Sequence, residues 1–257
     1  MFLKEPVFGE KKADIHALDT PEAYSLHREI IERKALLREI YGFYFKELIG
    51  PLEPSAGKKI VEIGAGAYNT DEYEPSVITS NSGINPYIRV VFDAQVMPFK
   101  DSSLDGVVML NVLHHIPKAR LFFGEVSRTL KDGGAMVMVE PYFSPLGWFV
   151  YKYLHHEPVL KTPIEWEIPD GLVANQIMPY HIFTRDRDVF EREYPDLKIE
   201  SVRAHTCCTH IISGGLTYRA LAPDSMCGLV WGLEAALTPF RGLLAMFMTV
   251  VVRKREL

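Results

Sequence analysis

The chain has 257 residues, of which 47% are hydrophobic and 24% charged, a composition typical of a globular protein with a sizeable core. This composition excludes a disordered, a collagen-like or a disulfide-scaffolded chain. The formal net charge of -5 argues against nucleic acid as a partner, because no global positive field is present to hold a phosphate backbone.

The three cysteines, Cys207, Cys208 and Cys227, do not show the spacing of a zinc site or of a disulfide framework. Adjacent cysteines on a strand would point to opposite faces, which is poor geometry for sharing one ion. We therefore expect no metal site, and we expect a reducing, cytoplasmic location.

No targeting or membrane-spanning segment is predicted. The N-terminal sequence MFLKEPVFGEKK reaches charges and a proline before any apolar run as long as that of a signal peptide. The apolar stretch 226–252 is interrupted by Glu234, Pro239 and Arg241, which leaves runs too short for a transmembrane helix. The aromatic stretch 146–154 leaves contact with a membrane surface open.

A long helix is predicted near the N-terminus. Thr20, Pro21 and Glu22 supply an N-cap residue, a proline for the first helical position and an acid for the first turn. The helix should extend to about residue 48, with one apolar face against the core. We expect residues 1–57 to form a helical N-terminal cover.

The next part of the chain predicts alternating strands and helices. Short apolar runs rich in Val, Ile and Met indicate strands covered on both faces. Residues 117–130 indicate a helix between the fourth and fifth strands, ended by Lys131 and the Gly133-Gly134 pair. This alternation favours a parallel, doubly wound sheet that binds ligands at the carboxyl ends of its strands. The expected strands are 59–63, 76–80, 89–92, 106–110 and 135–139.

The second half contains a long aromatic connection at 141–196, a length more typical of a binding lid than of a structureless loop. After it we expect a strand at 197–205, a helix around 229–237 and a final strand at 243–253. The predicted organisation is thus one domain, 58–257, with a lid insertion at 141–196.

A glycine turn follows the first strand. Glu62 precedes Gly64 and Gly66, whose missing side chains let a ligand approach the backbone closely. A nicotinamide-binding fingerprint would place a third glycine where Asn69 stands, so that reading is disfavoured. Asn81, Asp93 and Asn111 follow the next three strands, so polar groups should converge at one edge of the sheet.

Residues 61–141 resemble the class I S-adenosylmethionine-dependent methyltransferases, and in particular their type 11-like methyltransferase domain. The motifs that carry the resemblance are VEIGAG, FDAQVMPF, LDGVVMLNVLHHIP and LKDGGAMVMVEP. It implies an α/β, Rossmann-like doubly wound sheet of seven strands, mostly parallel with an antiparallel last strand, and S-adenosyl-L-methionine as cofactor. It also implies that Glu62, Gly64 and Gly66 line the methionine part, that Asp93 meets the adenine amine, that Ala94 and Gln95 flank the adenine ring, and that Asn111 lies beneath the sulfonium.

The flanking motifs VITSN, YKYLHHEP and IISGG resemble a narrower bacterial branch of this class, which does not define a substrate. Methyltransferases of this class commonly end the second strand with an acid that binds the ribose hydroxyls. Here Asn81 stands at that position, and as a neutral acceptor it should bind the ribose more weakly. Tyr68 stands where a third glycine is common, and the short stretch that follows predicts a truncated first crossover helix.

The candidate catalytic residues are His115, His114 and Glu140, with Tyr142, His156 and Glu157 as candidate substrate or lid residues. Histidine suits proton transfer near neutral pH. Each candidate also has a structural alternative. An imidazole can cap the following helix or bond a backbone carbonyl, and Glu140 can form an ion pair at its strand end.

We expect methyl transfer to a small-molecule, glycan or lipid-linked acceptor at oxygen or nitrogen. The Asn/Asp-Pro-Pro-Tyr/Phe motif of enzymes that methylate exocyclic amines is absent after Asn111. The alternative is a non-catalytic binding module that keeps the methyltransferase fold, and Asn81 and Tyr68 motivate it. The sequence does not define the oligomeric state.

Overall fold

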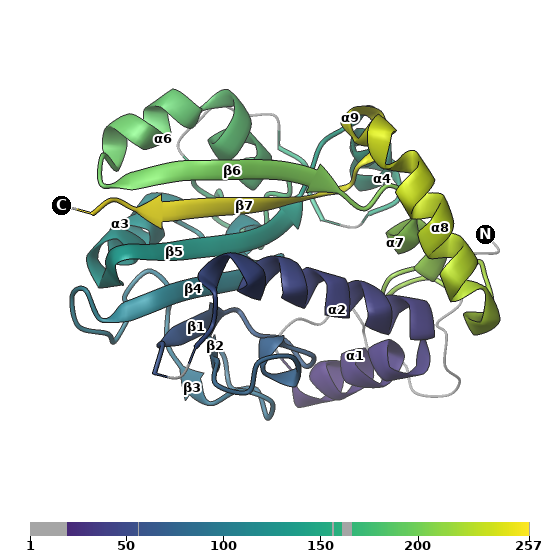
Figure 1. Cartoon of the computed structure of the whole chain (residues 1–257), viewed down its shortest axis with the longest axis horizontal. Helices are drawn as coiled ribbons and strands as arrows, with labels where there is room; N and C mark the ends of the chain where they lie inside the picture. Colours follow the sequence, from purple (N-terminus) through teal and green to yellow (C-terminus); the bar gives the residue numbers. More distant parts are fainter. Residues whose placement is uncertain (1–19, 56, 156, 161–165, 257) are drawn as a thin grey trace.

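The computed structural model describes residues 20–55, 57–155, 157–160 and 166–256, and Figure 1 shows their arrangement around one twisted sheet. Seven strands pair in the order β3-β2-β1-β4-β5-β7-β6, in which β7 is antiparallel to both of its neighbours. The strands are β1 (Ile60–Ile63), β2 (Ile78–Asn81), β3 (Val90–Val91), β4 (Leu104–Leu110), β5 (Leu130–Pro141), β6 (Leu197–His205) and β7 (Phe247–Lys254). The predicted seven-stranded, doubly wound sheet is confirmed.

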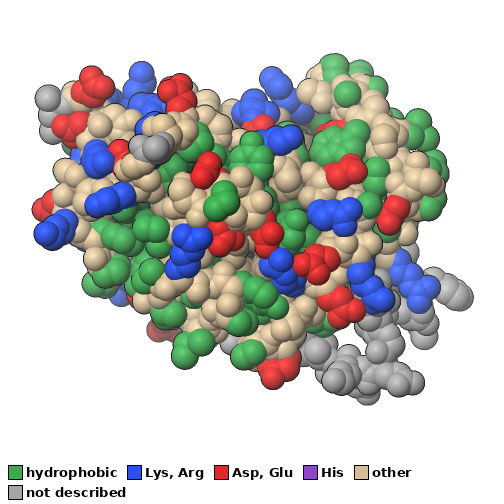
Figure 2. Space-filling view, turned by 60° about the horizontal axis from the view of Figure 1, so that its bottom comes forward, with side chains coloured by type: hydrophobic (Ala, Val, Ile, Leu, Met, Phe, Trp, Pro, Cys, Tyr) green, Lys and Arg blue, Asp and Glu red, His purple; other side chains and the backbone are tan. Residues whose placement is uncertain are grey.

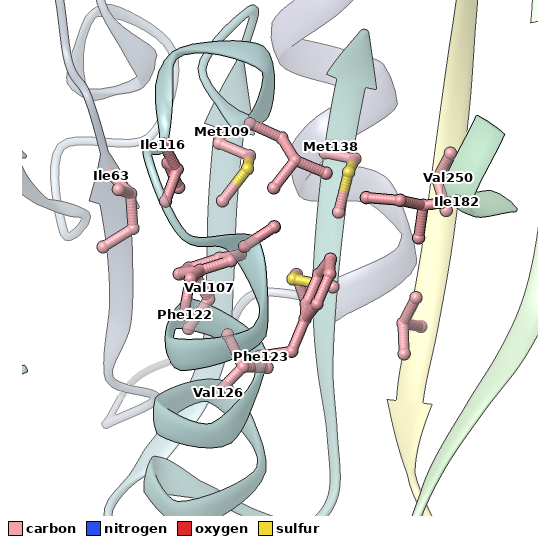
Figure 3. Packing of buried hydrophobic residues seen from close by; sticks show 14 of the residues in the cluster. Ile63, Val107, Met109, Ile116, Phe122, Phe123, Val126, Met138, Ile182 and Val250 are labelled. Atoms are coloured by element: carbon pink, nitrogen blue, oxygen red, sulfur yellow. The ribbon is translucent and has the colours of Figure 1, made fainter. Parts of the chain in front are cut away.

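The central strands are apolar because helices cover both of their faces. On one face, α3 (Ala119–Thr129) packs Phe122, Phe123 and Val126 against the side chains of β1, β4, β5 and β7, as Figure 3 shows. On the other face, α2 (Ala35–Ile49) packs against β4 and β5, and it crosses in front of the sheet in Figure 1. The carboxyl ends of the parallel strands are thereby held at one edge.

The structure divides the predicted N-terminal helix into α1 (Pro21–Arg33) and α2. The break falls at Lys34, whose backbone is extended at φ -95° and ψ 101°. Lys34 is buried, and its Nζ donates hydrogen bonds to the carbonyl oxygens of Ser213, Gly215 and Tyr218. The helix is interrupted because the chain turns this ammonium group toward partners that are distant in sequence.

The boundaries of the fifth strand also differ from the prediction. Helix α3 ends at Thr129 and β5 begins at once, since Leu130 pairs with Leu104 of β4. The Gly133-Gly134 pair, expected to end a helix, therefore lies inside a strand. An ion pair of 2.7 Å between Lys131 and Asp105 supports this early start.

The connection between β1 and β2 lacks a full crossover helix, as predicted, and holds only the short turn η2 (Thr70–Glu72). The turn η3 (Leu113–His115) follows β4, and η1 (Gly50–Leu52) follows α2. The short η2 connection keeps the loop after β1 close to the amino-terminal helices, where Tyr68 stacks on Phe45 with ring centroids 5.9 Å apart.

The insertion after β5 contains α4 (Pro145–Tyr153), α5 (Met178–Tyr180), the π-helical turn η4 (His181–Arg185) and α6 (Arg187–Glu193). Its aromatic residues divide into two groups. Trp166 and Phe183 are buried in contact with Phe123 of α3, whereas Phe149 and Tyr153 of α4 are exposed. Part of the insertion is thus core, and its action as a lid remains a prediction.

The carboxyl-terminal part contains α7 (Thr209–Ser213), η5 (Asp224–Met226), α8 (Cys227–Leu237), η6 (Thr238–Phe240) and α9 (Arg241–Leu244). The final strand begins at Phe247, later than predicted, because α9 occupies the first residues of the expected range. Within the described part of the chain, the helices lack the combined length and apolar character needed to cross a bilayer.

Candidate active site

The glycine turn after β1 packs directly against the end of β4. Gly64 has a φ of 68°, and a Cβ added there would lie 2.5 Å from Cγ2 of Val112. A side chain at this position would be strained and would also clash. A Cβ added at Gly66, by contrast, would meet no described heavy atom within 4 Å, so the backbone is open there. The turn can therefore accept a ligand against Gly66.

Two buried asparagines hold this turn. Nδ2 of Asn69 donates to the carbonyls of Gly66 and Tyr87 at 3.1 and 3.0 Å. Nδ2 of Asn85 donates to the carbonyl of Ala65 at 3.0 Å. Because these amides bond the backbone that a ligand would approach, they hold the turn in one conformation. The sequence analysis did not identify Asn85 in this role.

Glu62 lies behind the turn. It is 2% exposed, and its Oε2 accepts hydrogen bonds from the backbone N and the Oγ1 of Thr70 at 2.8 and 2.6 Å. Burial outweighs these hydrogen bonds and raises the pKa of the Glu62 carboxyl to about 7. Its hydrogen bonds with Thr70 hold the loop, and the contact of Glu62 with the methionine part of a cofactor remains a prediction.

The ends of β2 and β3 carry the predicted nucleoside-binding groups. Nδ2 of Asn81 donates to Oη of Tyr24 at 2.9 Å, so α1 takes part in this end of the site. Oδ1 of the exposed Asp93 accepts the backbone N–H of Gln95 at 2.8 Å. The adjoining Ala94 is buried. Both carboxylate oxygens of Asp93 also accept from Nε2 of Gln95 at 3.2 Å, and the contact of Asp93 with an adenine amine remains a prediction.

Asn111 occupies a special position at the end of β4. Its φ is 55°, and its backbone N–H donates to the carbonyl of Val139 at 2.8 Å. Its Oδ1 is buried and has no hydrogen-bond partner among the described atoms. A buried acceptor without a partner costs about 1–3 kcal/mol, so such atoms are rare unless a ligand supplies the donor. Left-handed backbone and an unpartnered amide oxygen both indicate a binding position.

Glu140 at the end of β5 organises the loop after β4. It is fully buried, and its Oε1 accepts the backbone N–H groups of Val112 and Leu113 at 2.8 and 2.7 Å. Its Oε2 lies 2.7 Å from Nδ1 of His114. Because Glu140 bonds two backbone N–H groups of the loop after β4 and contacts the ring of His114, this carboxylate positions that loop and that imidazole.

His114, His115 and Glu157 come together, although Glu157 belongs to the insertion. Nε2 of His114 lies 3.5 Å from Oε2 of Glu157, and Nε2 of His115 lies 3.4 Å from Oε1. Burial opposes protonation of His114, but the carboxylates of Glu140 and Glu157 outweigh it and raise its pKa to about 9. Burial raises the pKa of Glu157, but the neighbouring histidines outweigh it and lower the value to about 2.

His115 is the more accessible imidazole of the pair. Its side chain is 28% exposed against 3% for His114, and its Nδ1 lies 3.0 Å from the carbonyl oxygen of Val173. Burial and the neighbouring His114 lower its pKa, which keeps the ring neutral at neutral pH. Since the carbonyl can only accept, a neutral His115 carries its proton on Nδ1 and presents a lone pair on Nε2.

The remaining candidates lie as follows. Tyr142 is half-buried with its ring against Tyr180, and its contact with a substrate remains a prediction. His156 lies outside the described residues. Sequence reasoning missed Gln176, which is buried and contacts both His114 and Glu157. The two neighbouring amide residues Asn175 and Gln176 could have been noticed in the sequence. The contact between His115 and Val173 could not, because it uses a backbone carbonyl, which every residue has.

Comparison with known proteins agrees with this geometry. A model of the methyltransferase domain family matches residues 61–138. A fatty-acid O-methyltransferase from Mycolicibacterium smegmatis is 31% identical over 96 residues, which are 30% of this chain and 35% of that protein. The chain thus matches about a third of the length of this curated relative.

Solved structures share the fold at low identity. Geranyl diphosphate C-methyltransferase from Streptomyces coelicolor is 13% identical with a TM-score of 0.52, covering 98% of this chain and 91% of that one. A chain of a complex that contains the Trm112 methyltransferase activator of Haloferax volcanii is 13% identical with a TM-score of 0.51, covering 93% and 99%. Residues 61–138 thus match the methyltransferase domain family, and the strand order and fold of the described residues are shared with a solved methyltransferase structure.

Proposed function

We propose that this chain transfers a methyl group from S-adenosylmethionine to an oxygen or nitrogen atom of a small-molecule acceptor. The observation that carries the proposal is the end of β4, where the unpartnered Oδ1 of Asn111 is followed within one turn by His114 and His115. A cofactor position and a pair of candidate proton acceptors thus adjoin each other.

The residues present fit the cofactor. The open backbone at Gly66 admits a ligand, and Asn111 offers a buried acceptor that the folded chain leaves unused. By resemblance, Asp93 would meet the adenine amine and Asn81 the ribose. Because Asn81 is neutral and already donates to Tyr24, we expect weaker ribose binding than a carboxylate would give.

The sulfonium supplies an activated methyl group, so the protein has to orient the acceptor, exclude water and remove a proton where needed. His115 has the most exposed side chain of the cluster, so its Nε2 is the best placed to accept that proton. Glu140 and Glu157 position the two imidazoles. Glu140, which is fully buried, does not reach an acceptor itself.

Local charge favours a neutral or cationic acceptor. The two carboxylates of Glu140 and Glu157 exceed the single positive charge of protonated His114, which leaves one negative charge in a buried site. A hydroxyl or amine group avoids repulsion there, whereas a free carboxylate does not. Acidic and basic side chains are interspersed on the face drawn in Figure 2, in keeping with a small-molecule acceptor. Glycan and lipid-linked alcohols belong to the same acceptor class.

The experiment is a single-turnover assay with S-adenosylmethionine labelled in the methyl group and a panel of alcohols, amines and carboxylic acids. We expect transfer to alcohols or amines, and we expect His115→Ala to reduce the rate about 100-fold with little change in cofactor affinity. His181→Ala, a histidine of the η4 turn, is the matched control. Full activity of His115→Ala would refute its role as the base.

The alternative is a non-catalytic binding module, which the engagement of Asn81 by Tyr24 favours. In that case a calorimetric titration with S-adenosylmethionine would show no cofactor binding. The two proposals therefore separate before any acceptor is found.

A further inference from the structure

Three side chains of metal-binding type converge where η3 faces the insertion. One ligand atom from each of His114, His115 and Glu157 can be chosen so that all three lie within 4.8 Å of one another. Nε2 of His114 lies 3.5 Å from Oε2 of Glu157, and Nε2 of His115 lies 3.4 Å from the other oxygen, Oε1. Among the residues that the structure describes, no second group of three such side chains meets this condition.

Each imidazole is anchored through its other nitrogen. Nδ1 of His114 lies 2.7 Å from a carboxylate oxygen of Glu140, and Nδ1 of His115 lies 3.0 Å from the carbonyl oxygen of Val173. Both partners can only accept, so both rings carry a proton on Nδ1. His115 directs the lone pair of its Nε2 at Glu157, whereas Nε2 of His114 carries a second proton in the metal-free site. A metal ion would take the place of that proton, and two imidazole nitrogens and one carboxylate would then hold it between them.

The geometry fits a metal ion. Zinc bonds of 2.0–2.2 Å in a tetrahedral site separate the ligand atoms by about 3.3 Å, close to the two separations of 3.4 and 3.5 Å. Metal-binding histidines regularly donate their second N–H to a carboxylate or a backbone carbonyl, and Glu140 and Val173 provide one of each. A proton on one imidazole can satisfy only the contact of that ring with Glu157. One metal ion would bind both imidazoles and the carboxylate at once.

A second observation at the cluster points to a ligand. Gln176 is 2% exposed, and its Nε2 lies 3.3 Å from Nε2 of His114 and also contacts Glu157. Its Oε1 is buried without a hydrogen-bond partner among the described atoms. Rotation of the amide by half a turn would direct this unused oxygen at the cluster. Gln176 can therefore supply a fourth donor atom.

We propose that His114, His115 and Glu157 bind a divalent first-row transition-metal ion, for which zinc is the best match. Two imidazole nitrogens and one carboxylate suit zinc, whereas magnesium and calcium prefer sites made of oxygen atoms. This inference departs from the expectation of no metal site, which was drawn from the cysteines. No local motif predicts the site, because Glu157 comes from the insertion.

The ion would change how the acceptor is activated, and this part of the inference rests on the proposed function. With the ion bound, His115 would be a ligand, so the role of base proposed above would belong to the metal-free chain. The ion would lower the pKa of a coordinated hydroxyl group and add positive charge to a site with an excess of carboxylates. An acceptor would approach from the side of His115, whose side chain is more exposed than that of His114.

The test is a titration of the full chain, stripped of metal by a chelator, with zinc followed by calorimetry and with cobalt followed by visible absorption. We expect one saturable site and cobalt bands typical of nitrogen and oxygen ligands. An absence of saturable binding would overturn the proposal. Strong thiolate-to-cobalt charge-transfer bands would also overturn it, because they would place the ion on cysteines.

Substitutions locate the ion. We expect His115→Ala and Glu157→Gln each to weaken zinc binding at least about tenfold, and the His181→Ala control to leave it unchanged. Glu140→Gln should weaken it about 10- to 100-fold, since an amide that donates to Nδ1 of His114 moves the ring proton onto Nε2. Retained folding of each variant is checked by its melting temperature. If His115→Ala and Glu157→Gln both bound zinc as tightly as the parent chain does, the assignment would be refuted.

Zinc binding requires neither the cofactor nor an acceptor, so the two proposals fail separately. Cofactor binding without zinc binding would overturn only the metal site. Zinc binding without cofactor binding would overturn the proposed methyl transfer and leave the metal site standing.

Discussion

Replacing Glu62 with glutamine should remove a pH-dependent loss of stability from the fold. The carboxyl is 2% exposed and accepts two hydrogen bonds from Thr70, which a glutamine Oε1 can also accept. Burial raises the pKa of Glu62 from 4.5 to about 7, despite the opposing effect of those bonds. The ionised form is thus penalised in the folded chain and not in the unfolded one.

The sign and size follow from linkage. Between pH 4.5 and 7 the folded state binds more protons than the unfolded state, so stability falls as pH rises through this window. The contribution of Glu62 is fully present below pH 4.5 and is lost above 7. A pKa difference between 4.5 and about 7 corresponds to about 3 kcal/mol in the free energy of unfolding.

The assay is urea unfolding of the parent and of Glu62→Gln at intervals from about pH 4.5 to 8. We expect the variant to gain relative stability as pH rises, up to about 3 kcal/mol. Glu22→Gln, at an exposed position in the first turn of α1, is the control and should show no such trend. A constant difference between parent and Glu62→Gln would refute the view that Glu62 is buried behind the glycine turn.

Other substitutions test the cofactor pocket and the core. Gly64→Ala should lower the free energy of unfolding by more than about 1 kcal/mol, because its φ of 68° and the contact with Val112 leave no room, as urea unfolding would show. Gly66→Ala should leave the free energy of unfolding unchanged and weaken cofactor binding about tenfold in calorimetry. Unchanged affinity would contradict the inference that the cofactor approaches the backbone at Gly66. Asp93→Ala should weaken cofactor binding by about 1–3 kcal/mol through loss of a hydrogen bond, and equal affinity would contradict the placement of the adenine. Phe123→Ala should lower the free energy of unfolding by about 3–5 kcal/mol, since the ring is fully buried among Trp166, Phe183 and Phe190, and a loss below about 1 kcal/mol would contradict that packing.

The fold was predictable where local pattern and burial agree. Buried apolar runs such as 106–110 are strands because helices cover both faces of the sheet, and that pattern is visible in sequence. The break at Lys34 was not predictable, since its cause is three carbonyls far away in the chain. The glycines at 133 and 134 were misread for a similar reason, because the pairing of Leu130 with Leu104 outweighs the local preference for a turn.

The candidate site was predictable to a different extent. Asn81, Asp93 and Asn111 could be named because strand ends of a parallel sheet share one edge. Sequence alone could not show that Asn111 keeps an unpartnered oxygen, that Tyr24 bonds Asn81, or that Gln176 reaches His114. These features depend on the path of α1 and of the insertion across the sheet, which no local pattern encodes.

The most direct test of the account is titration of the purified chain with S-adenosylmethionine and with S-adenosylhomocysteine, followed by heat of binding and by melting temperature. We expect both ligands to bind, and at about 100 times the dissociation constant the fold should gain about 2.7 kcal/mol. Neither heat nor a shift in melting temperature at millimolar ligand would contradict the proposed methyl transfer and would favour a binding module that keeps the fold alone.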